Sequence, residues 1–121
     1  IDYFNKIKPP YNVNSLTQSR ALAQLETSES IQNQVISLIS ERKKLEQELK
    51  QFDFVSKIYP SDANFLLVVV DDANKRYDQF LDAGVVLRNR SRLQGCNNAL
   101  RVTVGTPEEN TNFIKICKII D

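Results

Sequence analysis

Histidine, methionine and tryptophan are absent from the 121 residues, while cysteine occurs only twice and glycine three times. Without histidine the chain cannot form a Ser-His-Asp or Cys-His catalytic group, and most kinds of zinc site are excluded. Neither sign of charge is in excess, since 16 basic residues stand against 15 acidic ones and give a net charge of +1. This balance gives no case for a protein that neutralises many nucleic-acid phosphates.

Long apolar runs are also lacking. The longest, Phe65 to Val70, is far too short for a helix that crosses a bilayer, and the N-terminal residues carry no basic-plus-apolar signal. We therefore expect no membrane partner. The length fits one domain. Because the chain begins at Ile1 and contains no methionine, we expect it to be a piece of a longer protein.

The two cysteines do not form a recognisable motif. Cys96 and Cys117 have no further cysteine and no histidine near them, so their spacing is not that of a metal site. Cys117 falls in the apolar pattern at the end of the chain and is predicted to be a buried small hydrophobe. Cys96 lies in a polar loop and is predicted to be a bystander thiol. This usage favours a reducing, cytoplasmic setting.

The first residues read as a connector. The Pro-Pro pair at 9–10 disfavours helix just before it, so residues 1–14 are expected to form the end of a preceding helix and an interdomain connector. The domain proper is expected over residues 15–121. Asn14 or Ser15 can cap its first helix, and Thr27-Ser28 can restart the helical pattern.

A long amphipathic helix is predicted next. Apolar residues recur at 3.6-residue spacing from Ile31 to Phe52. The charged residues between them, Glu41 among them, are expected on the solvent face. This helix is expected to pack on a sheet, because strand-like segments follow it.

Four segments are predicted as strands: 54–59 near a sheet edge, 65–70 covered on both faces, 85–88, and 100–104 with one buried face. A helix that starts at Asp71 or Asp72 and stops at Gly84 separates the two pairs. Thr106-Pro107-Glu108-Glu109 signals the start of a final helix. The fold class is therefore α/β, of the α+β kind, with a small, mostly antiparallel sheet of about four strands packed against helices.

Two arginines carry the strongest chemical signal. Arg101 alternates with Leu100 and Val102 in a short strand and is expected on the opposite face from them. A charge there must reach water, pair with a carboxylate or face an anionic ligand, because an unpaired buried charge costs several kcal/mol. A structural ion pair and an anion-binding role are both open on these grounds. Arg88 ends the segment 85–88 and begins a run of alternating arginines that lacks aromatic residues for base stacking.

Four motifs, in order, resemble the C-terminal part of the histidinol-phosphate aminotransferase family. They are Lys-Pro-Pro-Tyr-Asn-Val-Asn at 8–14, Ala-Asn-Phe at 63–65, Gly-Val-Val-Leu-Arg at 84–88, and Leu-Arg-Val-Thr-Val-Gly-Thr at 100–106 with Glu109-Asn110. The resemblance runs through essentially the whole chain. It implies the small domain of a fold-type I enzyme that uses pyridoxal 5′-phosphate (PLP).

The resemblance also implies an activity and its division between domains. The family transfers an amino group between glutamate and imidazole acetol phosphate in histidine biosynthesis, with 2-oxoglutarate and histidinol phosphate on the other side of the exchange, and works as a homodimer. It implies that Arg101 and Arg88 bind the anionic group of the substrate. The Schiff-base lysine and the cofactor-binding residues are expected in a large domain outside this chain. We accordingly expect no catalytic, cofactor-binding or metal-binding residue here and no activity from the chain alone.

Other functions remain open. A related aromatic amino acid aminotransferase or a threonine-phosphate decarboxylase would share the fold and the strand arginine. A free-standing module that binds an anionic metabolite or another protein without catalysis is also consistent with the composition.

Overall fold

The computed structural model describes Tyr3, Lys6 and residues 13–26 and 28–121. Most of the predicted helix end at 1–7 and most of the predicted connector at 8–13 lie outside the described residues. The chain divides into two compact units, residues 1–34 and 35–121.

In the first unit the predicted helix is α2, Ser15–Leu25. The Asn14 side chain caps it by accepting a hydrogen bond of 2.8 Å from the backbone N–H of Thr17, which confirms one of the two predicted caps. The next helix, α3, spans Ser28–Leu49 and so begins at the predicted restart. The boundary between the units falls within α3.

In the second unit the C-terminal part of α3 packs through Leu45 and Leu49, which are buried. Val35 and Ile39, predicted on the same apolar stripe, remain exposed. The prediction that Glu41 lies on the solvent face is wrong, since this residue is only 7% exposed. Its partner there is Asn110 of the last helix, far away in the sequence and therefore invisible to helical periodicity.

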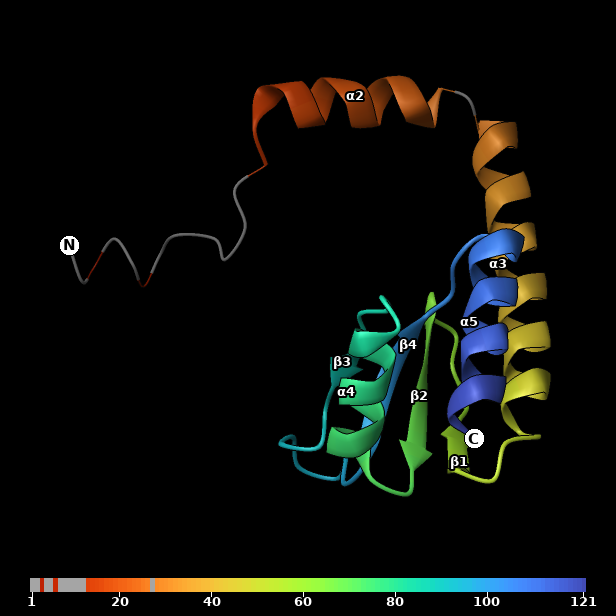
Figure 1. Ribbon diagram of the computed structural model, residues 1–121. Helices are drawn as coiled ribbons and strands as arrows, with labels where there is room; N and C mark the ends of the chain where they lie inside the picture. Colours follow the sequence, from red (N-terminus) through yellow and green to blue (C-terminus); the bar gives the residue numbers. More distant parts are fainter. Residues whose placement is uncertain (1–2, 4–5, 7–12, 27) are drawn as a thin grey trace. The chain divides into compact units, whose positions relative to one another are not determined.

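The sheet has four strands: β1 Val55–Tyr59, β2 Phe65–Val70, β3 Arg88–Asn89 and β4 Ala99–Thr103. Their order is β1-β2-β4-β3 and every pair is antiparallel. The predicted fold class and the edge position of the first strand are thus confirmed. Figure 1 shows β2 and β4 at the centre of the sheet.

The third strand is shorter and later than the predicted segment 85–88. Helix α4 spans Ala73–Asp82. Gly84 follows it at φ +81°, a left-handed conformation that suits glycine. The backbone N–H of Val85 still bonds to the carbonyl of Phe80 at 2.8 Å. Because the helix end holds this residue, the chain joins the sheet only at Arg88.

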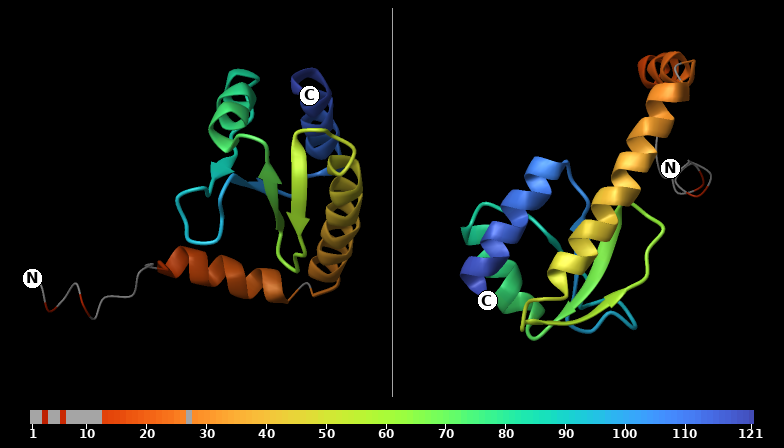
Figure 2. Two further views of the ribbon diagram at one scale, coloured as in Figure 1. Left: turned by 90° about the horizontal axis from the view of Figure 1, so that it is seen from below. Right: turned by 90° about the vertical axis from the view of Figure 1, so that its right-hand side faces the viewer.

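One face of the sheet is covered by helices. Figures 1 and 2 show α4 and the last helix, α5 (Pro107–Ile120), on the same face. In β2, Leu66, Val68 and Val70 are buried, whereas the alternate residues are only partly so. The prediction that both faces of β2 are covered is therefore wrong. The rest of the core comes from the helices, from β4 and from the connecting segments, with Phe80, Leu100, Val102, Phe113 and Cys117 among its buried members.

The start of α5 follows the predicted signal. Thr106 and Glu109 form a capping box, and Pro107 occupies the first turn. A Cβ atom on Gly105 would lie 2.9 Å from the Cβ of Glu109 and 2.8 Å from its Oε2. Glycine is required at this point because the capping side chain folds back against the turn.

Candidate anion-binding site

The two arginines singled out from the sequence lie directly opposite one another in neighbouring strands. Arg88 of β3 is the register partner of Arg101 of β4, so their side chains project from the same face of the sheet. Arg101 also faces Leu67 of β2, which in turn faces Tyr59 of β1. The row across the sheet therefore changes from an aromatic and an apolar residue in β1 and β2 to one arginine each in β4 and β3.

This arrangement has no acidic counterpart within the sheet. All four strands lie in the described part of the chain, and none contains an aspartate or a glutamate. Directly opposed like charges destabilise a sheet. An anion placed between the two guanidinium groups would remove that repulsion.

Arg101 is half-buried yet has no ion-pair partner among residues 13–26 and 28–121. Its Nε is buried and makes no hydrogen bond to a described residue. Its guanidinium carbon lies 5.2 Å from the centre of the Phe65 ring. Of the two roles left open by the sequence, the structural ion pair thus has no partner in the part of the chain described.

A second buried arginine, which sequence reasoning missed, shows what a structural ion pair looks like in this fold. Arg76 is 6% exposed and donates from Nε and Nη2 to the two carboxylate oxygens of Asp71, at 2.9 and 2.8 Å. Its Nη1 donates to the carbonyl of Ile120, and its guanidinium carbon lies 4.6 Å from the centre of the Phe54 ring. The hydrogen bonds from Arg76 lower the pKa of Asp71 to about 2. The signal for this pair was an Asp and an Arg five residues apart at a helix start.

Most residues of the last family-like motif also have structural roles. The side chain of Asn110 accepts from the N–H of Gly105 at 2.9 Å and donates to its carbonyl at 3.1 Å. It also donates to Oε2 of Glu41 at 3.0 Å. Hydrogen bonds from Lys44 and Asn110 lower the pKa of the Glu41 carboxyl. The turn and helix start thus account for Gly105, Thr106, Glu109 and Asn110, and Arg101 is the charged residue of this motif that they leave unexplained.

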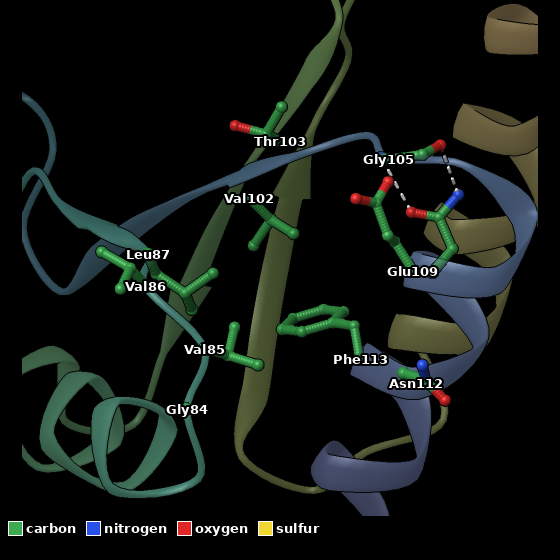
Figure 3. Close-up of a pocket in the computed structure, with 11 residues that line it drawn as sticks. Gly84, Val85, Val86, Leu87, Val102, Thr103, Gly105, Glu109, Asn112 and Phe113 are labelled. Atoms are coloured by element: carbon green, nitrogen blue, oxygen red, sulfur yellow. Dashed lines mark hydrogen bonds between the residues drawn. The ribbon is translucent and has the colours of Figure 1, made fainter.

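A pocket on the helical side of the sheet does not serve the same chemistry. Figure 3 shows this cavity of about 450 Å³, lined chiefly by apolar side chains of the segment 84–87, of β4 and of α5. Its one charged residue is Glu109, which is engaged in the capping box. Neither Arg88 nor Arg101 lines it. It offers no positive charge to an anionic ligand.

The described residues hold neither a metal site nor a membrane-spanning helix. They contain no group of three or more Cys, Asp or Glu side chains arranged to hold a metal ion. No helix among them has the length and apolarity needed to span a bilayer. Every lysine in the described part of the chain is exposed.

Comparison with known proteins places this fold in a class. Residues 1–116 match the family described as aminotransferase class I and II, and the chain belongs to that family. Its fold is like that of the histidinol-phosphate aminotransferase of Clostridium acetobutylicum, with a TM-score of 0.82 and 23% sequence identity over 98% of this chain and 36% of that one. The α/β fold with a four-stranded antiparallel sheet is thus that of an aminotransferase C-terminal domain.

Within the class, the chain is similar to relatives that share one name. The chain is 55% identical over its whole length to the histidinol-phosphate aminotransferase of Christiangramia forsetii. It is 52% identical over 99% of its length to the protein of the same name from Flavobacterium psychrophilum. The resemblance predicted from the four motifs is confirmed. The chain spans about a third of the length of these relatives, 35% and 34% respectively.

Proposed function

We propose that this chain is the small-domain part of a histidinol-phosphate aminotransferase, which exchanges an amino group between glutamate and imidazole acetol phosphate. Support comes from the identity of 55% and 52% to relatives that carry this name. The particular substrates, the homodimer and the cytoplasmic location belong to this proposal.

Within that enzyme, the proposed role of the chain is to hold the anionic group of the substrate through Arg101 and Arg88. The observation that carries this role is their direct cross-strand opposition on a face with no acidic strand residue. A planar guanidinium can donate two parallel hydrogen bonds to a carboxylate or to a phosphate. The same pair can therefore receive glutamate in one half-reaction and a phosphate ester in the other.

PLP is the cofactor that the family implies, and it acts as an electron sink when it is bound to an enzyme. The described residues do not fit its attachment, because each of their lysines is exposed. We therefore propose that the Schiff-base lysine and the cofactor contacts belong to a large domain outside this chain. The chain by itself is then expected to be inactive.

The test uses the complete protein from its native reading frame. Arg101→Leu and Arg88→Leu are compared with Arg92→Leu, a matched control because Arg92 is an exposed loop residue outside the sheet. A charge-assisted hydrogen bond contributes about 1.5–3 kcal/mol, so Arg101→Leu should raise the KM for 2-oxoglutarate and for histidinol phosphate by roughly 10- to 150-fold. The absorbance of bound PLP should be unchanged in all three variants. Unaltered KM values for both substrates in Arg101→Leu would refute the anion-binding role.

The same purified protein distinguishes the competing activities. Histidinol phosphate, an aromatic amino acid and threonine phosphate are offered in parallel, and amino transfer and decarboxylation are followed separately. The proposal requires transfer from histidinol phosphate to have the highest kcat/KM. Preference for another compound would replace the named activity, while an absence of any turnover by the PLP-loaded protein would favour a non-catalytic binding module.

A further inference from the structure

We propose that Phe65 is a positioning residue that holds the Arg101 guanidinium in place for the substrate anion. This inference rests on the anion-binding role proposed above for Arg101. It adds a residue to which neither charge nor hydrogen-bonding capacity draws attention, since a phenylalanine side chain offers only the face and edge of its ring.

The Phe65 ring lies close to the Arg101 guanidinium. Phe65 is the register partner of Thr103, so it stands diagonally from Arg101 on the same sheet face, within reach of a long side chain. The distance of 5.2 Å from the guanidinium carbon to the ring centre is within the range of a cation–π contact. Among the described residues, no ion pair accompanies this contact at the Arg101 guanidinium.

The contact with the ring leaves hydrogen-bond donors of Arg101 unused. A ring accepts no conventional hydrogen bond from the guanidinium, so the Nη donors of Arg101, which unlike Nε are not buried, remain available to a ligand. In Arg76 the corresponding donors are taken up by Asp71 and by the carbonyl of Ile120. Arg76 and Arg101 therefore both lie near a phenylalanine ring, but only Arg76 has its donors taken up by protein acceptors.

Hydrogen bonds hold the backbone around Phe65 in place. The Ser61 hydroxyl donates to the carbonyl of Phe65 at 2.6 Å and accepts from the N–H of Ala63 at 3.2 Å. Arg42 of α3 donates to the carbonyl of Ala63 at 2.6 Å. The carbonyl of Asn64 accepts from the N–H of Val104 at 2.9 Å. A ring on so constrained a support can order a flexible arginine before the ligand arrives.

Ordering in advance matters here because Arg88 stands directly opposite Arg101 and repels it. Without the ring, Arg101 would be free to turn toward solvent and away from Arg88. Binding would then have to restrict its rotamers as well as neutralise the pair, which weakens affinity. The effect should fall on substrate binding and leave the chemical step nearly unchanged.

The experiment uses the complete PLP-loaded protein with Phe65→Leu, Phe65→Tyr, Arg101→Leu and the double variant Phe65→Leu/Arg101→Leu. Phe65→Leu should raise the KM for histidinol phosphate and the inhibition constant of inorganic phosphate by about 3- to 10-fold, with kcat changed less than about 2-fold. Phe65→Tyr keeps the ring and should restore both constants to within about 2-fold of the unsubstituted protein. In the Arg101→Leu background, Phe65→Leu should have no further effect.

The outcomes separate the two proposals. If Arg101→Leu leaves both constants unchanged, the anion-binding role fails and the positioning role fails with it. If Arg101→Leu raises them but Phe65→Leu does not, the positioning role alone is overturned. Equal effects of Phe65→Leu and Phe65→Tyr, or a full Phe65→Leu effect in the double variant, would also overturn it, because either result would mean that Phe65 acts independently of the cation–π contact. Melting temperatures of all variants identify any loss of folding.

Discussion

Replacement of Asp71 by asparagine tests whether its pair with Arg76 stabilises the fold in a pH-dependent way. The hydrogen bonds of Arg76 lower the pKa of Asp71 from 3.8 to about 2 in the folded chain. A shift of this size corresponds to roughly 2.4 kcal/mol at about 1.36 kcal/mol per unit. The Asp71 side chain is 45% exposed, so solvent screening reduces the expected contribution to about 1 kcal/mol.

The pH dependence of this stabilisation follows from the lowered pKa of Asp71. Because the folded pKa lies below the unfolded one, the contribution is fully present above about pH 4 and is lost as the pH falls toward 2. The free energy of unfolding of the 121-residue chain is measured in urea by far-ultraviolet circular dichroism at several pH values. The difference between the unsubstituted chain and Asp71→Asn should shrink by about 1 kcal/mol between pH 5 and pH 2.

The matched control is Asp78→Asn, an exposed carboxylate on α4, the helix that carries Arg76. Its difference from the unsubstituted chain should stay small at every pH. A difference for Asp71→Asn that is constant from pH 5 to pH 2 would refute the reasoning, because it would mean that the pair contributes nothing that depends on the charge of Asp71.

Two further predictions concern packing and reactivity. Gly105→Ala should lower the free energy of unfolding by about 1–3 kcal/mol in urea denaturation, because the new Cβ would lie 2.9 Å from the Cβ of Glu109; an unchanged midpoint would contradict the close approach. Burial raises the pKa of the Cys117 thiol to about 12, so at neutral pH iodoacetamide should modify Cys96 first and reach Cys117 only after urea is added. Mass spectrometry of the peptides reads this out, and equal labelling of both thiols in the native chain would count against a closed core.

The parts of the fold that were predictable are those whose causes lie a few residues apart. The Asn14 cap, the stop at Gly84 and the capping box at 106–109 each depend on bonds between near neighbours in the sequence. The alternation of Leu100, Arg101 and Val102 likewise predicted which face Arg101 occupies.

The candidate site was predictable in its residues but not in its geometry. Arg88 and Arg101 stood out as charges beside short apolar strands, yet nothing in the sequence set one opposite the other. Their register depends on where β3 begins. The start of β3 depends in turn on the hydrogen bond by which the carbonyl of Phe80 holds Val85 at the end of α4. Phe65 stood in one of the four family-like motifs, but nothing in the sequence indicated its contact with Arg101, since a phenylalanine in an apolar strand is expected in the core.

Helix ends and strand alternation were predictable because local hydrogen bonds and periodicity are properties of neighbouring residues, and the aminotransferase resemblance came from short motifs. Which charged groups are buried, and which partners they have, depends instead on the tertiary structure. Glu41 meets Asn110 across 69 positions of the chain, and the Arg76 guanidinium reaches the carbonyl of Ile120 across 44. The physical reason is that the cost of burying a charge depends on the groups packed around it, and these are brought together only when the sheet and helices close on one core.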